Sequence, residues 1–285
     1  YALGVMCLDL PNEIVATKRN SPLIVGVGKD ENFIASDFSA ILKYTNEICT
    51  LENNEFAVLY EDRVEFYDNN LKKYPKELKR IDLTNEDTEK NGYNHFMQKE
   101  INENTLTIKN TVSEYLKDED IKFDFDIPEE VLKKIKHIHI VACGTAMHAG
   151  LNGKNIIEKL TRIPVIVDVA SEFRYRDPII DKDDFAIFIS QSGETADTIA
   201  CIELVKSKNV NFLSIVNVKE STIDRMSDNV IYTKAGPEIA VASTKAYVAQ
   251  VCAIDLFAIY LADILKSVDS KVLKDLKTEL KNIHN

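Results

Sequence analysis

The chain is 285 residues long, with 45% hydrophobic and 28% charged residues. This composition is ordinary for a soluble globular protein, and it excludes a wholly disordered chain, a collagen-like repeat and a disulfide scaffold. Acidic residues outnumber basic ones by 46 to 35, which gives a formal net charge of −11. Since no basic patch interrupts this charge, we expect binding to neither nucleic acid nor membrane.

Five cysteines are widely spaced and form neither a C-x-x-C motif nor a Cys/His cluster with zinc-binding spacing. We therefore expect reduced thiols, a cytoplasmic location, no metal and no cofactor. His137 and His139 alternate on one expected strand without a third ligand in range, and His148 lies on the following helix. We therefore expect these to be surface or hydrogen-bonded histidines. The chain shows no signal peptide and begins with Tyr1 in a strand-like segment, so we expect it to be part of a longer protein.

The first 68 residues are expected to form short strands. Apolar segments separated by Pro, Asn and Ser lie at 1–9, 13–19, 22–28, 47–52, 55–61 and 63–68. This succession favours antiparallel hairpins over βαβ units, with one helical stretch near Asn32–Lys43. Residues 69–92 are charged and poor in aliphatic side chains, which indicates a linker. From His95 to Leu116 the apolar residues recur with helical spacing.

Beyond Pro128 the pattern changes to strand, loop and helix in repetition. Nearly continuous apolar strands are expected at 137–142, 164–170, 184–190, 211–217 and 229–234. Strands of this kind are buried on both faces, so the fold class is α/β, with a doubly wound parallel sheet flanked by helices over residues 93–266. Residues 267–285 are expected to form one more polar helix that leads to a further domain.

The segment Tyr247–Leu265 is just long enough to cross a membrane, but Gln250, Asp255 and Asp263 interrupt it. An unpaired carboxylate is costly in hydrocarbon, so we expect a buried or interface helix instead. Because this helix could face a second copy of the chain, we also expect a homodimer.

Three loops at the carboxyl ends of expected strands carry Gly with Ser or Thr, at 143–146, 190–195 and 235–245. Ligands bind at this edge of an open α/β sheet. In the middle loop, SQSGET, an apolar strand ends at Ser190, turns at Gly193 and enters a helix. The free N–H groups of that helix and the hydroxyls of Ser190, Ser192 and Thr195 can hold a phosphate monoester with neutral donors, and Gly193 lets the backbone approach it. The alternative is that Ser192 or Thr195 only caps the helix. Three such loops on one edge favour phosphate binding.

The other two loops carry residues with more than one possible role. Thr145 can cap a helix or offer its hydroxyl to a ligand, and Cys143 can be read as a nucleophile or as a small structural thiol. Lys245 can form a Schiff base, bind phosphate or pair with a neighbouring carboxylate. We favour the structural thiol for Cys143 and the ion pair for Lys245.

Five segments together resemble one family, the glutamine:fructose-6-phosphate aminotransferases, also called glucosamine-6-phosphate synthases. They are FMQKEI (96–101), CGTAMHAG (143–150), ASEFRYR (170–176), SQSGETADT (190–198) and AGPEIAVASTKAY (235–247). Residues 21–37, SPLIVGVGKDENFIASD, resemble the same family's glutaminase domain. The resemblance implies a β-rich remnant of an N-terminal-nucleophile glutaminase domain over 1–68, a linker over 69–92, a first sugar-isomerase (SIS) domain over 93–266 and a connection to a second SIS domain over 267–285.

The resemblance also implies a function. Enzymes of this family make glucosamine 6-phosphate from fructose 6-phosphate and glutamine, and their S-Q-S-G-E-T loop grips the sugar phosphate. The implied sugar-phosphate-binding residues are Ser190, Gln191, Ser192, Thr195, Gly144, Thr145, Val241 (through its backbone carbonyl) and Ser243. Two departures stand out: Ala146 replaces a family serine, and NENT (102–105) follows MQKEI where a Pro is usual.

The family's catalytic groups lie outside this chain, since its N-terminal cysteine nucleophile and its second SIS domain are not in the sequence. We therefore expect the chain to bind a sugar phosphate without glutaminase or synthase turnover, and we assign no catalytic residue. Two alternatives stay open: an SIS module that senses a sugar phosphate, and a stand-alone SIS aldose–ketose isomerase. Residues 1–67 disfavour the isomerase because they have no place in it.

Overall fold

The structure is a computed structural model of residues 1–285, and it describes all of them except 37, 81–88 and 285. The chain divides into two compact units, Tyr1–Asn91 and Gly92–Asn285. Each unit has its own hydrophobic core, so the two are described separately.

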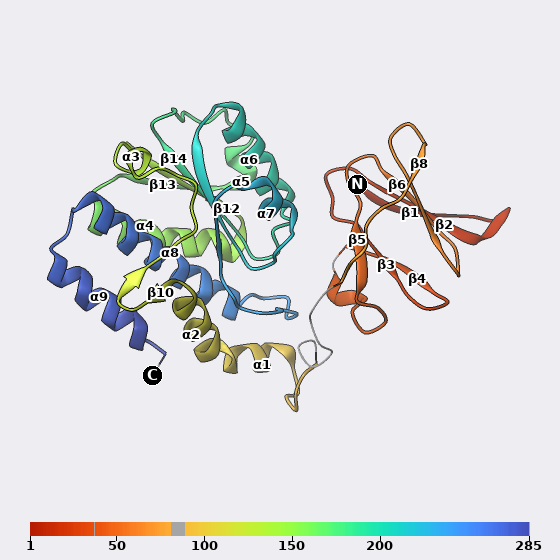
Figure 1. The fold of residues 1–285 in the computed structure, drawn as a ribbon, viewed down its shortest axis with the longest axis horizontal. Helices are drawn as coiled ribbons and strands as arrows, with labels where there is room; N and C mark the ends of the chain where they lie inside the picture. Colours follow the sequence, from red (N-terminus) through yellow and green to blue (C-terminus); the bar gives the residue numbers. More distant parts are fainter. Residues whose placement is uncertain (37, 81–88, 285) are drawn as a thin grey trace. The chain divides into compact units, whose positions relative to one another are not determined.

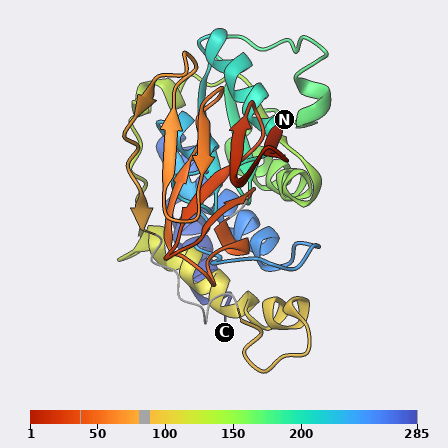
Figure 2. The same cartoon turned by 90° about the vertical axis from the view of Figure 1, so that its right-hand side faces the viewer.

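The first unit consists of two antiparallel sheets, which confirms the hairpins expected from the short apolar segments (Figure 2). One sheet has the order β1(Ala2–Cys7), β2(Leu10–Lys18), β6(Phe56–Leu59), β7(Val64–Tyr67), β8(Lys73–Tyr74). The other has the order β4(Asn32–Ala35), β3(Ile24–Val27), β5(Glu47–Thr50), β9(Lys79–Arg80). Side chains from both sheets fill the core between them, among them Ala16, Val25, Cys49, Leu51, Ala57, Leu59 and Phe66.

The prediction of a helix near Asn32–Lys43 is wrong. Its first part is the strand β4, which pairs with β3 through a tight turn in which Gly28 N donates to Glu31 O at 3.0 Å. Only a short 3₁₀ turn, Phe38–Ala40, is helical among the described residues of that segment. Cross-strand pairing therefore decides the conformation of a segment whose local pattern is ambiguous.

The segment expected as a linker, 69–92, includes the short strands β8 and β9. Strand β8 is held in this unit by Tyr74. The ring of Tyr74 packs against the apolar core, and its hydroxyl donates to Glu55 at 2.6 Å. Residues 81–88 of the expected linker lie outside the described part of the chain.

The second unit is built around a five-stranded parallel sheet, as expected (Figure 1). The strand order is β13(Val165–Val169), β12(Ile138–Ala142), β14(Phe185–Ser190), β15(Asn211–Val216), β16(Val230–Tyr232). Before the sheet come α1(Phe96–Asn102), α2(Asn104–Tyr115), the hairpin β10(Leu116–Lys117)–β11(Asp120–Ile121) and α3(Glu129–Leu132). The helices that follow are α4(Gly144–Thr161), α5(Ala170–Phe173), α6(Ala196–Ser207), α7(Thr222–Met226), α8(Lys245–Leu265) and α9(Ser270–Asn282).

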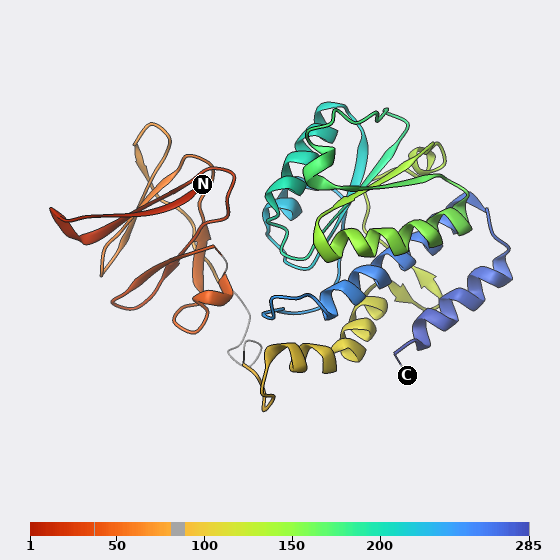
Figure 3. The same cartoon turned by 180° about the vertical axis from the view of Figure 1, so that it is seen from behind.

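Alternating side chains on each strand supply both faces of the sheet. On β12, Ile138 and Ile140 join the apolar cluster that includes α4 and α8, while Val141 joins the cluster that includes α5, α6 and α7. Helices therefore cover both faces, as a doubly wound sheet requires. Figure 3 shows α4 and α8 lying side by side, in agreement with their packing contacts.

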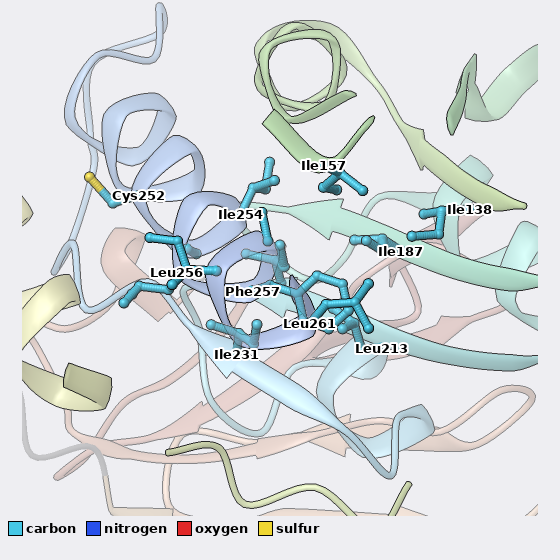
Figure 4. Packing of buried hydrophobic residues seen from close by; sticks show 14 of the residues in the cluster. Ile138, Ile157, Ile187, Leu213, Ile231, Cys252, Ile254, Leu256, Phe257 and Leu261 are labelled. Carbon is cyan, nitrogen blue, oxygen red and sulfur yellow. The ribbon is translucent and has the colours of Figure 1, made fainter. Parts of the chain in front are cut away.

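Helix α8 is the core helix of this unit. Figure 4 shows Ile254, Phe257 and Leu261 of α8 pointing toward Ile187 and Leu213 of the sheet. Among the described residues, α8 is the one helix long and apolar enough to cross a membrane, and 61% of its apolar window is buried inside the protein. The prediction of a buried helix is thus confirmed, because these apolar side chains pack against the sheet of the same unit. The homodimer stays a prediction.

Candidate functional site

The strand order creates a point at which successive connections leave the sheet in opposite directions. Strand β12 lies between β13 and β14, so the chain passes from β12 to β13 on one side and then returns to β14 on the other. Ala142 pairs in register with Ile189, and Ser190 pairs with Val216. The loops that follow these strands therefore leave from one edge of the sheet, at the position where α/β proteins bind their ligands.

The loop 190–195 is shaped by its own hydroxyl groups. Ser190 is buried, and its Oγ accepts a hydrogen bond from Gly193 N at 3.0 Å and lies 3.0 Å from Thr195 Oγ1. Ser192 Oγ accepts a hydrogen bond from Glu194 N at 3.1 Å. Thr195 occupies the N-cap position of α6 but makes no side-chain capping bond. The hydroxyls thus order the turn. Thr195 does not cap the helix with its side chain, while a capping role for Ser192 stays open.

Gly193 has a role that the sequence pattern did not reveal. Its φ of +68° lies in the left-handed region, and a Cβ at this position would overlap the side chain of Ser221. The carbonyl of Gly193 accepts a hydrogen bond from Ile223 N at 2.9 Å. The glycine is therefore required for close packing of this loop against the start of α7, as well as for the turn itself.

The loop 143–146 leads directly into α4, an 18-residue helix that begins at Gly144. Gly144 has a φ of +59°, and a Cβ there would meet no atom within 4 Å, so open space lies next to this helix N-terminus. Thr145 is exposed, whereas Ala146 is buried in the apolar core. Cys143 is half-buried against the apolar cluster on the other face of the sheet, as a structural thiol would be.

The loop 235–245 is held by carboxylates. Glu238 Oε1 accepts hydrogen bonds from Thr244 N at 2.9 Å, Ala246 N at 3.2 Å and Ser243 Oγ at 3.2 Å. Val241 projects from the loop and is fully exposed. Lys245 is buried, and its Nζ lies 2.6 Å from Glu103 Oε2, so the expected pairing of this lysine with a carboxylate is confirmed.

Asn217 connects two of these loops, and sequence reasoning missed it. Its backbone N–H donates to Gln191 O at 3.2 Å, its Nδ2 donates to Gly236 O at 2.8 Å, and its Oδ1 accepts from Ala235 N at 2.8 Å. A detectable signal was present, because Asn217 is the polar residue directly after the apolar strand β15, whose last residue, Val216, pairs with Ser190.

Further polar contacts brace the 190–195 loop from outside. Glu194 Oε1 accepts a hydrogen bond from Thr222 N at 2.7 Å. Arg174, in the segment ASEFRYR, donates to Asp197 in the first turn of α6 at 2.7 Å. The described structure therefore brings together Ser190, Gln191, Ser192 and Thr195 in one ordered turn. Gly144 and Thr145 follow the adjacent strand, β12. Val241 and Ser243 lie on the loop 235–245, which Asn217 connects to Gln191.

His137 and His139 serve structural contacts. His137 Nδ1 lies 2.8 Å from Asp184 Oδ1, and His139 is buried, which lowers the pKa of its imidazole below the ordinary value. Among the described residues, no three His, Cys, Asp or Glu side chains are grouped so that they could hold a metal ion.

The parallel sheet with Gly- and Ser-containing loops at one edge defines a class of protein: residues 131–260 match the family model described as SIS domain. The similarity then extends over nearly the whole chain to one enzyme family. The chain is 48% identical over 285 residues to a glutamine–fructose-6-phosphate aminotransferase [isomerizing] from Clostridium tetani, a match that covers 99% of this chain and 47% of that protein. It is 50% identical to the enzyme of the same name from Caldanaerobacter subterraneus, with the same coverage of both chains.

Solved structures are similar to the second unit as well. The C-terminal domain of glucosamine-fructose-6-phosphate aminotransferase from Francisella tularensis superposes with a TM-score of 0.66 at 42% identity, over 69% of this chain and 56% of that one. A glucosamine-6-phosphate deaminase from Thermotoga maritima, at 18% identity and a TM-score of 0.51, covers 66% of this chain and 54% of that one and shares the fold. The aminotransferase resemblance expected from the sequence motifs is thus confirmed. The chain spans about half the length of the curated relatives that it matches.

Proposed function

We propose that this chain is the sugar-phosphate-binding part of an enzyme that makes glucosamine 6-phosphate from fructose 6-phosphate and glutamine. The observation that carries the proposal is the ordered turn 190–195 at the edge of the sheet, where Ser192 and Thr195 hydroxyls stand at the start of α6. Its donors are neutral, and the partial positive charge of a helix N-terminus adds to them, which suits a phosphate dianion. The similarity to aminotransferases supports a hexose phosphate as the ligand.

The sugar part of the ligand is assigned to the neighbouring loops. Gly144 and Thr145 lie beside open space at the start of α4, and Val241 and Ser243 lie on the loop that follows β16. Hydroxyl and backbone groups of this kind match the hydroxyls of a ketose or aldose phosphate. Ala146 packs in the core, so any phosphate contact that a serine makes in relatives must come here from another donor or from water.

Residues 1–68 are proposed to be the C-terminal part of a glutaminase domain. The sheets of this unit and the similarity over 99% of the chain to aminotransferases support this origin. The chain alone is proposed to bind its ligand without turnover, in the cytoplasm and without a cofactor. A module that only senses a sugar phosphate and a stand-alone aldose–ketose isomerase are the competing proposals. Formation of glucosamine 6-phosphate by the purified chain would contradict the claim that it does not turn over.

The test of the phosphate site is a titration of fructose 6-phosphate, glucose 6-phosphate and inorganic phosphate, followed by calorimetry or by amide chemical shifts. For the double variant Ser192→Ala, Thr195→Ala we expect affinity for all three ligands to fall by roughly ten- to a hundredfold, since each lost hydroxyl removes one hydrogen bond to a charged group. A variant on α6 outside the loop, Ser207→Ala, serves as the control because Ser207 is exposed and its hydroxyl donates to Leu204 O on the same helix. Equal affinity in the wild type and the double variant would remove these hydroxyls from the proposed site.

A further inference from the structure

A buried carboxylate from α1 contacts the backbone of the loop that carries Val241. Glu100 is 2% exposed, and its Oε1 accepts hydrogen bonds from two consecutive backbone groups, Ile239 N at 2.7 Å and Ala240 N at 3.0 Å. Glu100 and this loop are separated by 139 residues in sequence. Both contacts lie directly before Val241, which is fully exposed.

The opposite flank of the same loop is held independently. Glu238 binds Thr244 N and Ala246 N on the far side of Val241, and Lys245 pairs with Glu103, one residue beyond the end of α1. The exposed segment around Val241 is therefore fixed on both sides by carboxylates. Charge-assisted bonds to backbone N–H groups are among the stronger hydrogen bonds in proteins.

The environment of Glu100 is costly for folding. Its second oxygen, Oε2, is buried and makes no hydrogen bond within the described part of the chain. A buried carboxylate with an unpartnered oxygen costs free energy, and a neutral side chain at this position would avoid that cost. We therefore look for a role of Glu100 in function as well as in stability. Its contact with the backbone of Ile239 and Ala240 offers such a role.

We propose that Glu100 is a positioning residue for sugar recognition, which fixes the backbone at Ile239–Ala240 so that Val241 is held ready for the sugar hydroxyls. The inference rests on the proposed function, because it assigns Val241 to the sugar and the loop 190–195 to the phosphate. It adds α1, the helix of the FMQKEI motif, to the elements that determine which phosphate ester is bound. Glu100 acts through the loop and does not itself contact the ligand.

The test separates the sugar from the phosphate. In Glu100→Leu, which removes the acceptor at similar volume, we expect the affinity for fructose 6-phosphate to fall by roughly tenfold, while that for inorganic phosphate stays within about twofold. In Glu100→Gln, whose carbonyl oxygen can still accept both bonds, the affinity for fructose 6-phosphate should return to within about threefold of the wild type. Amide hydrogen exchange at Ile239 and Ala240 should be slow in the wild type and faster in Glu100→Leu.

The control is Glu130→Gln, which removes one exposed carboxylate elsewhere in the same unit. A purely structural role for Glu100 would weaken both ligands in parallel with a lower melting temperature, and that result would overturn the inference. An unchanged affinity of both variants for fructose 6-phosphate would overturn it as well. If the wild type binds neither ligand, the proposed function itself fails. Should Glu100→Leu not fold, amide exchange in the wild type decides, since exchange at Ile239 and Ala240 as fast as at the exposed residues Val241 and Ala242 would contradict the positioning role.

Discussion

Gly193 and Gly144 share a left-handed backbone but differ in their surroundings. A Cβ at Gly193 would overlap Ser221, whereas a Cβ at Gly144 would meet open space. We therefore expect Gly193→Ala to lower the free energy of unfolding by about 2–4 kcal/mol, from backbone strain and steric overlap together, and Gly144→Ala by about 1 kcal/mol, from strain alone. Urea denaturation of both variants measures the difference. Equal losses would mean that the contact with Ser221 does not constrain the loop.

Some contacts of single residues could be predicted from the sequence and others could not. The hydroxyl and glycine pattern of 190–195 was visible in the sequence, because a strand that ends in Ser and turns at Gly is a local signal. The contacts of Asn217 and Glu100 were not visible, since each bonds to residues distant in sequence, Gly236 and Ile239. Local pattern predicts which residues carry chemistry, but only the packed structure shows which residues hold them in place.

Helix α8 carries two aspartates with opposite electrostatic environments. Burial raises the pKa of Asp255 to about 6, while hydrogen bonds from Lys266 and Lys277 lower the pKa of Asp263. A carboxyl whose pKa is raised in the folded state favours folding below its unfolded value near 4, and that contribution is lost as pH rises through about 6. We expect Asp255→Asn to raise the free energy of unfolding at pH 7.5 by about 1–3 kcal/mol, and the gain to disappear near pH 4.

Asp263→Asn is the matched control for this effect. Because the pKa of Asp263 is lowered in the folded state, its charged form stabilises the fold at neutral pH, and the variant should be less stable than the wild type at pH 7.5. This loss should disappear as pH falls through the lowered pKa. Thermal unfolding of the three proteins between about pH 2 and pH 8 tests both signs, and a destabilised Asp255→Asn at pH 7.5 would contradict the assignment.

At the scale of elements, strands and helices of the second unit were predicted well. Nearly continuous apolar runs such as Phe185–Ser190 have one explanation, a strand buried on both faces, and the structure bears this out. The segments that sequence reasoning placed wrongly are short. Asn32–Ala35 and Lys73–Tyr74 become strands because they pair with β3 and β7, and such pairing has no local signature.

The whole molecule consists of two units with separate cores, and the residues assigned to the ligand all lie in the second. We therefore expect residues 92–285 to fold alone and to bind fructose 6-phosphate with an affinity within about twofold of the whole chain, because the core of this unit is large enough for independent folding. Circular dichroism, a cooperative thermal transition and calorimetry check this. A disordered product, or a folded one that has lost binding, would show that the first unit contributes to the site.

The most direct measurement is a crystal structure of the chain grown with fructose 6-phosphate. We expect the phosphate group within hydrogen-bonding distance of Ser192 Oγ and Thr195 Oγ1, at the start of α6, with the sugar extending toward Thr145 and Val241. A phosphate bound at any other position, with the turn 190–195 unoccupied, would contradict the proposed site and the function built on it.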